Sequence, residues 1–218
     1  MKLVIFDFDG TLVDSRKLIW ELHRLVFDEF GLPCPSREQS LALIGISLEK
    51  VLAQLAGPGA PVEQMTAAYG RLLPQLREDP AFADAPFDGA AEMLAALAAR
   101  PDVLLGIATG HVSQAIEPVL QALGWRDHFS NLQSADRAPS KPHPGMLLQA
   151  LRETGTRAED AVMIGDTAFD MEMARAAGIE GIGVSWGYHG RERLLSAGAS
   201  RVVGDMGELR EHVFGCGL

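Results

Sequence analysis

The chain has 218 residues, of which 47% are hydrophobic and 22% are charged, and its formal net charge is −10. This length and composition suit a soluble globular protein with a substantial apolar core. The acidic balance argues against binding to nucleic acid or to an anionic membrane, because both would repel most of the protein surface. We therefore expect small-molecule partners.

The cysteines and the apolar segments are typical of a protein from a reducing compartment. Cys34 and Cys216 form neither a Cys-x-x-Cys pair nor a metal-ligand pattern, so a disulfide framework or a zinc site is not indicated. The apolar run at 3–6 ends at Asp7, which makes it too short for a secretory signal, and no stretch approaches a membrane span. We expect a cytoplasmic protein.

The first expected strand ends in two acidic residues, since residues 4–11 are VIFDFDGT. Asp7 and Asp9 lie on the same side of an extended chain, so their charges repel unless a cation or a shared proton intervenes. A bound Mg²⁺, with one carboxylate as nucleophile and the other as proton donor, would explain the pair. An acidic turn after an edge strand is the alternative interpretation.

A helical insert is expected after this strand. Apolar residues recur at helical spacing from Leu18 to Phe30, with Ser15 as the candidate N-cap and Gly31 as the stop. The next section, through about Pro86, has no convincing strand and predicts several short helices separated by proline and glycine clusters. The predicted domains are a helical insert at 15–87 and an α/β core made of 1–14 and 88–218.

From residue 88 onward, helical patterns alternate with short buried strands, which predicts a parallel sheet. The expected helices span about 90–99, 112–123, 144–152, 168–176 and 191–195, and the expected strands span about 103–108, 129–132, 161–164, 181–184 and 202–203. Polar groups follow several of these strands. Because ligands of open α/β sheets bind at the carboxyl ends of the strands, we expect the functional site there.

Four motifs, in order along the chain, resemble those of the haloacid dehalogenase-like (HAD) hydrolases. They are DFDGTLVDS at 7–15, GIATG at 106–110, SKPHP at 140–144 and GDTAFD at 165–170. The resemblance covers nearly the whole chain and implies a Rossmann-like parallel-sheet core with a small all-helical cap inserted after the first motif. It also implies a phosphatase, because members that cleave carbon–halogen bonds usually lack the second acid, here Asp9.

The resemblance implies a role for each motif residue in phosphoryl transfer. Asp7 is the implied nucleophile, which forms an aspartyl-phosphate, and Asp9 is the implied general acid and then general base. Thr109, Gly110 and Lys141 are the implied phosphate-binding groups. Without the resemblance, Thr109 and Gly110 would be interpreted as an ordinary turn, and Lys141 as a solvated surface charge.

The same resemblance implies a bound Mg²⁺. Its ligands would be the carboxylates of Asp7 and Asp166 and the backbone carbonyl of Asp9, with Asp170 supporting them from behind. Oxygen ligands of this kind are what Mg²⁺ requires. The alternative is that Asp166 and Asp170 are acidic residues favoured by the macrodipole at a helix N-terminus.

The second motif departs from the commoner Thr-Asn or Ser-Asn, since Gly110 and His111 follow Thr109. His111 either contacts the substrate or caps the next helix, and the cap is the preferred interpretation. His143 is expected to be structural. The segment 44–47 is the candidate loop that reaches into the site from the insert.

The substrate and the phosphoryl acceptor are left open by the motifs. The loop at 186–188 resembles that of phosphoglycolate phosphatases, which makes phosphoglycolate the first candidate among small phosphorylated metabolites. A sugar phosphomutase of the same superfamily is one alternative, although Ile19 stands where those enzymes carry a histidine and His23 lies one turn further. A phosphoacceptor signalling receiver is another, but the large insert and Asp9 argue against it.

Overall fold

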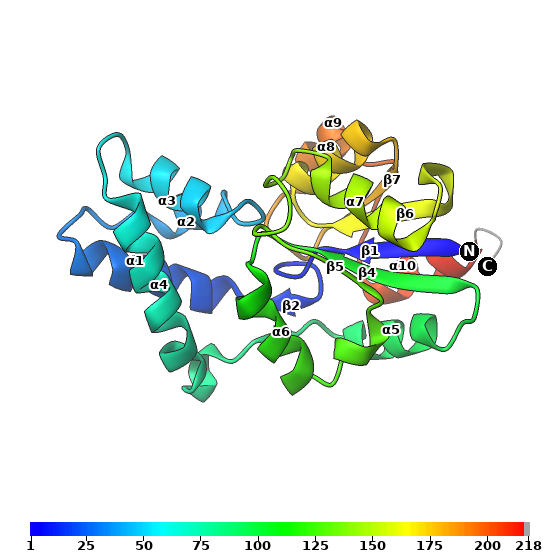
Figure 1. Cartoon of the computed structure of the whole chain (residues 1–218), viewed down its shortest axis with the longest axis horizontal. Helices are drawn as coiled ribbons and strands as arrows, with labels where there is room; N and C mark the ends of the chain where they lie inside the picture. The colour runs from blue at the N-terminus through cyan, green and yellow to red at the C-terminus, as the bar shows by residue number, and fades with distance from the viewer. Residues whose placement is uncertain (216–218) are drawn as a thin grey trace.

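The computed structural model describes residues 1–215 and is built on a six-stranded parallel sheet (Figure 1). The strand order is β5-β4-β1-β6-β7-β8. The strands are β1 (Lys2–Phe6), β4 (Val103–Ala108), β5 (Asn131–Gln133), β6 (Ala161–Gly165), β7 (Glu180–Val184) and β8 (Arg201–Val203). This confirms the predicted α/β core. The strands are apolar on both faces, as a sheet covered on both sides requires.

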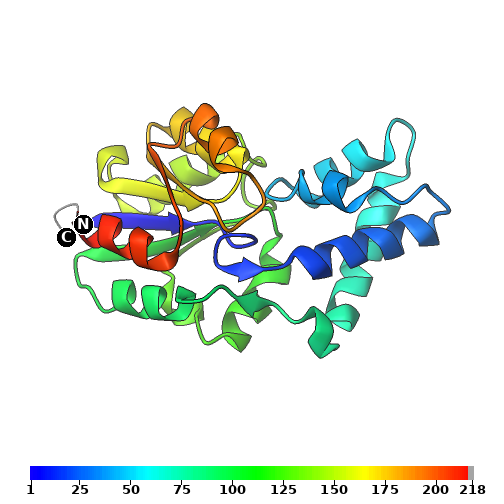
Figure 2. The same ribbon diagram turned by 180° about the vertical axis from the view of Figure 1, so that it is seen from behind.

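Helices cover both faces of the sheet, as the view from behind also shows (Figure 2). One face carries α5 (Ala90–Ala98), α6 (Ser113–Ala122) and α10 (Met206–Gly215), and the other carries α7 (Gly145–Thr154), α8 (Ala168–Ala177) and α9 (Arg191–Ala197). Short 3-10 helices lie at Arg126–His128 and Ala158–Asp160. The first of them occupies the approach to β5, so this strand begins at Asn131 rather than near Phe129.

Residues 16–82 form a helical region that packs around an apolar cluster of its own. It contains α1 (Arg16–Glu29), α2 (Arg37–Leu41), α3 (Leu48–Ala56), α4 (Val62–Arg77) and a 3-10 helix at Pro80–Phe82. Leu22, Leu52 and Met65, one from each of α1, α3 and α4, are fully buried in that cluster. The expectation of short helices is wrong for α4, which has 16 residues and continues through Pro74.

The two connections between the helical region and the sheet lie side by side. They form a small antiparallel pair of β2 (Val13–Asp14) and β3 (Ala85–Pro86), and the Phe87 N–H donates to the Leu12 carbonyl at 3.0 Å. The sequence did not indicate these strands, because each has two residues and one contains a proline, which cannot donate to a ladder. The last helix, α10, was also not predicted.

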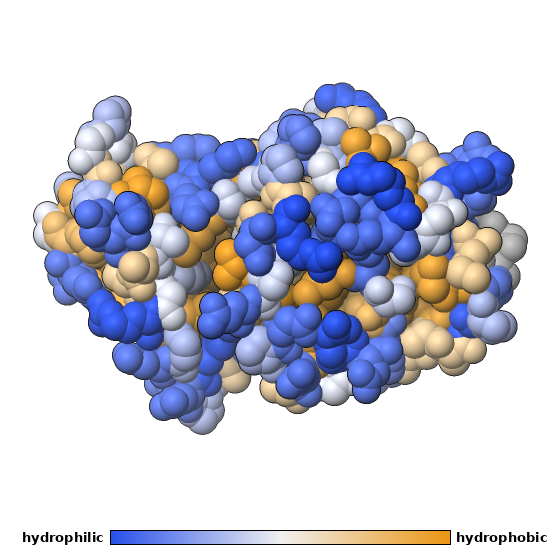
Figure 3. Space-filling model, in the orientation of Figure 1, coloured by the Kyte–Doolittle hydropathy of each residue, from blue (hydrophilic) through white to orange (hydrophobic). Residues whose placement is uncertain are grey.

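The surface gives little sign of the buried apolar clusters. Figure 3 shows mainly hydrophilic residues on one face, with apolar residues appearing between them. Within residues 1–215, no helix is long and apolar enough to cross a membrane. Cys34 is exposed and free, and Cys216 lies outside the described residues.

Candidate active site

The four sequence motifs meet at the carboxyl edge of the sheet. Asp7 follows β1, Thr109 follows β4 and Asp166 follows β6, and β1 pairs with both other strands. These three side chains are buried. The parallel pairing therefore brings together residues that are far apart in the sequence, as expected for this sheet edge.

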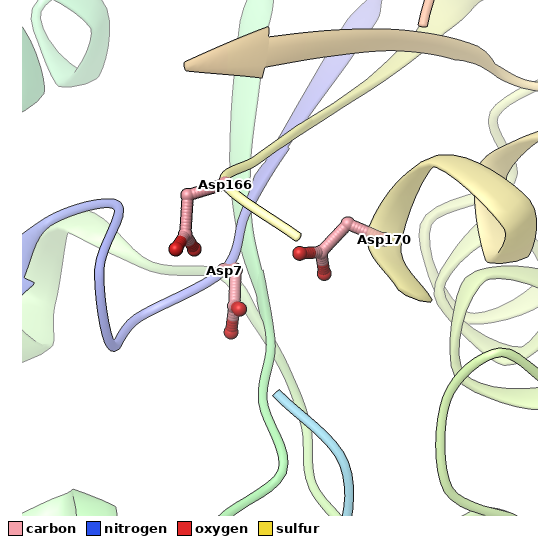
Figure 4. Close-up of side chains that lie close together, drawn as sticks. All are labelled: Asp7, Asp166 and Asp170. Atoms are coloured by element: carbon pink, nitrogen blue, oxygen red, sulfur yellow. The ribbon is translucent and has the colours of Figure 1, made fainter. Parts of the chain in front are cut away.

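Three carboxylates gather at this edge. Asp7, Asp166 and Asp170 each place one oxygen so that the three atoms lie within 4.8 Å of one another, and all three residues are buried (Figure 4). Asp170 comes from the first turn of α8. Lys141 Nζ lies 2.8 Å from Asp7 Oδ1 and 2.7 Å from Asp170 Oδ1. One ammonium group thus pairs with two of the three acidic side chains.

The excess of negative charge over positive charge in this cluster shifts the pKa values of its members. Burial raises the pKa of Asp7 to about 7, with Lys141 opposing the rise and Asp170 reinforcing it. Burial, together with Asp7 and Asp170, also raises the pKa of Asp166. Although burial opposes it, the attraction of Asp170 and Asp7 raises the pKa of Lys141, so this side chain is a permanent cation.

The geometry around the three acids fits a divalent cation. Asp7 Oδ2 is buried and has no hydrogen-bond partner, which is costly unless something else compensates it. The Asp166 carboxylate is held in place by the Thr11 hydroxyl at 3.1 Å and by the Tyr188 N–H at 2.8 Å. A set of buried carboxylate oxygens with an uncompensated negative charge suits Mg²⁺.

Asp170 is placed differently from the other two acids. Its Oδ1 pairs with Lys141, and its Oδ2 accepts from the Thr167 N–H at 3.0 Å and from the Thr167 hydroxyl at 2.6 Å. These last two contacts form part of the capping arrangement that starts α8. Both oxygens of Asp170 are therefore engaged within the protein.

Asp9 forms an ion pair with His111. Asp9 Oδ2 lies 2.6 Å from His111 Nε2, and Asp9 Oδ1 accepts a short hydrogen bond from the Ser15 hydroxyl. Burial alone would raise the pKa of Asp9, but the charge and hydrogen bond of His111 lower it below its usual value. Burial opposes the ionised form of His111 as well, yet Asp9 raises the pKa of the imidazole.

The preferred interpretation of His111 as a helix cap is wrong. Helix α6 begins at Ser113 with Val112 as its N-cap, and the His111 side chain points to Asp9 instead. The sequence could not indicate this partner, because the contact depends on how closely the ends of β1 and β4 approach. His143 meets its structural expectation, since its Nδ1 accepts from the Gly145 N–H at 3.0 Å at the start of α7.

Thr109 and Gly110 form the turn after β4. The Thr109 hydroxyl accepts from the His111 N–H at 3.2 Å, and the Thr109 N–H donates to Gln133 at the end of β5. A Cβ atom on Gly110 would lie 2.6 Å from the Ile46 carbonyl oxygen and 3.0 Å from that of Gly45. Only glycine therefore permits this close approach of the helical region to the motif.

A cavity of about 280 Å³ lies between the helical region and the sheet edge. It reaches Asp7, Asp9, Gly110 and His111, and the segment 44–47 forms part of its wall, as the sequence suggested. The cavity lining does not include Thr109, Lys141, Asp166 or Asp170, which lie deeper around Asp7.

Two contacts of this site were not expected from the sequence. His189 Nδ1 accepts from the Ala168 N–H at 2.8 Å, at the start of α8, and its Nε2 lies 3.2 Å from the Ala42 carbonyl oxygen. The Ser47 N–H donates to the Ser140 hydroxyl at 2.8 Å. Both contacts join the helical region to the core, and their only sequence signal is proximity to the motifs.

Comparisons with known proteins agree with the motifs. A family model described as haloacid dehalogenase-like hydrolase matches residues 4–184. "Probable phosphatase IndB" of Dickeya dadantii is 35% identical over 210 residues, which cover 95% of this chain and 91% of that protein. A phosphoglycolate phosphatase of Rhodospirillum rubrum is 32% identical over 228 residues, covering 95% and 89%. The crystal structure of a hydrolase from Pseudomonas syringae gives a TM-score of 0.85 at 26% identity, covering 98% of both chains.

Proposed function

This chain belongs to the haloacid dehalogenase-like hydrolases and is a phosphatase of that family, and we propose that it hydrolyses a small phosphate monoester, with Mg²⁺, through an aspartyl-phosphate on Asp7. The observation that carries the proposal is the Asp7 carboxylate. Its Oδ1 is fixed by Lys141, whereas its buried Oδ2 has no hydrogen-bond partner, and the residue lines the cavity. The lone pairs of Oδ2 are therefore not taken up by hydrogen bonds within the protein, which supports Asp7 as the attacking group.

The chemistry assigned to these residues has two steps. In the first, an Asp7 oxygen bonds to phosphorus, the ester P–O bond breaks, and Asp9 passes a proton from the paired His111 imidazolium to the departing alkoxide. In the second, Asp9 accepts a proton from water, the water oxygen bonds to phosphorus, and the bond to Asp7 breaks to release inorganic phosphate. His111 orients the Asp9 carboxylate through their ion pair.

The cationic and polar groups of the site would stabilise the negative charge of the phosphoryl oxygens. Mg²⁺, held by Asp7, Asp166 and the Asp9 carbonyl, would supply positive charge against the phosphoryl oxygens. Lys141 offsets the charge of Asp7 itself, and Thr109 and Gly110 offer a hydroxyl and an N–H at the end of β4.

We further propose that residues 15–87 act as a cap over the core. The contacts of His189 with Ala42 and of Ser140 with Ser47 would hold the closed state. The paired connections β2 and β3 would carry the opening movement that releases product.

The test is release of inorganic phosphate by the purified protein. Phosphoglycolate is the first metabolite to assay, because it is the substrate named for several relatives, and p-nitrophenyl phosphate is the general probe. Turnover should require Mg²⁺, stop with EDTA and be lost in Asp7→Asn. Many turnovers per molecule distinguish a phosphatase from a receiver that retains its phosphoryl group. Absence of turnover with every ester would refute the proposal.

A further inference from the structure

The cavity wall beyond Asp7 and Asp9 is mostly apolar. Residues of the helical region and of the core contribute to it, among them Ile19, Ile46, Val51, Tyr69, Leu73 and Val112. The part of a substrate that is not phosphate would lie against these side chains. Apolar walls of this kind favour apolar groups and penalise groups that require hydration.

The cationic side chain of the described lining, His111, is already paired with Asp9, so no free cation is offered to an anionic group in this cavity. Within residues 1–215, neither lysine nor arginine lines it. Lys141 is occupied by Asp7 and Asp170. Arg77, whose charge acts on Asp9, lies 2.8 Å from Asp84 through its Nε and donates to the Ala115 carbonyl.

The ionisable groups of the lining other than His111 add negative charge or none. Glu49 and Asp136 lie in the wall and would repel an anion. Burial lowers the pKa of His23 to about 4, so this side chain is neutral at physiological pH. Thr66 is a neutral polar group of the same wall. A second carboxylate brought in with the phosphate would therefore be desolvated without a free cationic partner.

The volume of the cavity suits more than a two-carbon acid. An apolar cavity of about 150 Å³ is large enough to hold a benzene ring, and the cavity here has about 280 Å³. There is room for a ring-sized group in addition to the ester oxygen near Asp9.

Building on the proposed phosphatase function, we propose that the preferred substrate is a phosphate monoester whose alcohol part is uncharged and largely apolar, and that the cavity discriminates against carboxylate-bearing esters such as phosphoglycolate. The wall of the helical region selects between esters. The catalytic groups do not, because they contact the phosphoryl group that all the esters share. Because burying an unpaired charge costs more than burying a neutral polar group, we expect this selection to exceed about a hundredfold.

A matched pair of esters tests the inference. Benzyl phosphate and 4-carboxybenzyl phosphate have the same kind of leaving group and differ by one carboxylate. The value of kcat/KM should be at least about 100-fold higher for benzyl phosphate than for 4-carboxybenzyl phosphate, and higher than for phosphoglycolate. Equal values, or faster turnover of phosphoglycolate, would overturn the inference while leaving the phosphatase intact. No turnover of any ester would refute the phosphatase proposal itself, and this inference with it.

A charge placed in the wall gives a second test. Thr66 is half-buried on α4, so Thr66→Lys can introduce an ammonium group into the lining, and Thr66→Met is the control of similar length without charge. Relative to Thr66→Met, Thr66→Lys should raise kcat/KM for 4-carboxybenzyl phosphate over benzyl phosphate by about tenfold or more. Melting temperatures confirm that both variants fold. An unchanged ratio in folded variants would contradict the proposal, because the wall would then not decide selectivity.

Discussion

Asp9 and His111 form a 2.6 Å ion pair across the ends of β1 and β4, and Ser15 at the start of α1 donates to the other oxygen of the same carboxylate. These contacts fix the orientation of the Asp9 carboxylate and place the His111 imidazole, a proton donor in its charged form, directly beside it. This arrangement links the proposed general acid to a residue that the motif pattern does not contain.

If Asp9 is the general acid, the rate loss caused by replacing it should depend on the leaving group of the ester. Asp9→Asn should slow the first, phosphorylating step by about 10²–10⁴-fold for an alkyl phosphate, the usual contribution of a general acid. The loss should be much smaller for p-nitrophenyl phosphate, whose leaving group needs little protonation. Single-turnover phosphorylation rates measure both, and equal losses would remove Asp9 from the acid role.

His111→Gln should show the same dependence on the leaving group, but with a smaller loss, because Asp9 remains and only its orientation and charge partner change. We expect a rate loss of about tenfold for an alkyl phosphate, which is the size of effect that removal of a hydrogen bond to a charged group can give. A loss that is the same for both kinds of ester would instead mean that His111 acts only in substrate binding or folding.

The position of Asp7 in the acidic cluster predicts that one substitution affects turnover and thermal stability in different ways. Asp7→Asn should reduce turnover more than a thousandfold, since an amide is a poor nucleophile. Thermal unfolding without metal should be unchanged or shifted upward, because the substitution removes one of three mutually repelling carboxylates. Residual turnover within tenfold of the unmodified enzyme would rule out the nucleophile assignment.

The different surroundings of Asp166 and Asp170 predict different metal responses. Asp166→Ala removes a candidate ligand, so it should weaken Mg²⁺ activation and abolish the increase in melting temperature that Mg²⁺ gives. Asp170→Ala removes a partner of Lys141 and of Thr167, so it should lower kcat and destabilise α8 with a smaller change in the Mg²⁺ requirement. Identical metal titrations for the two variants would contradict this division.

Much of the fold and the site was predictable because both follow from local patterns. The alternation of buried strands and helices predicts a parallel sheet, and parallel strands bring Asp7, Thr109 and Asp166 to one edge. The partners of His111 and His189 were not predictable, since these contacts form only when separate loops and the helical region come together. Strands β2 and β3 have only two residues each, which is too short for an alternation of apolar and polar residues to predict a strand.

The departure of the second motif at Gly110 has a structural cause and a testable effect. A Cβ there would lie 2.6 Å from the Ile46 carbonyl oxygen, so Gly110→Ala should push the 44–47 segment outward and raise KM about tenfold or more. Gly190→Ala is the control, because nothing lies within 4 Å of the added carbon and its φ of −68° is ordinary. Equal KM values in both variants would show that close contact at Gly110 is not needed.

The last prediction concerns stability in acid and rests on His23. This side chain is buried in the helical region, and its ring lies 6.0 Å from that of Tyr69 between centroids, in a tilted arrangement. Burial lowers the pKa of His23 from 6.5 to about 4, and its Nδ1 has no hydrogen-bond partner. Below pH 6.5 the unfolded chain therefore binds a proton that the folded chain excludes, so this contribution is complete above pH 6.5 and is lost as the pH falls toward 4. Between pH 7.5 and pH 5 the loss should be about 2 kcal/mol.

Urea unfolding at the two pH values measures this loss, and His23→Leu should remove it. The exposed His143 provides the matched control, because His143→Leu should keep the full difference between the two pH values. The comparison uses the change with pH in each variant, so any direct effect of the leucine on stability cancels. If His23→Leu lost as much stability in acid as the unmodified protein, the acid sensitivity would have to come from the carboxylates, whose protonation in acid is the usual cause of acid unfolding.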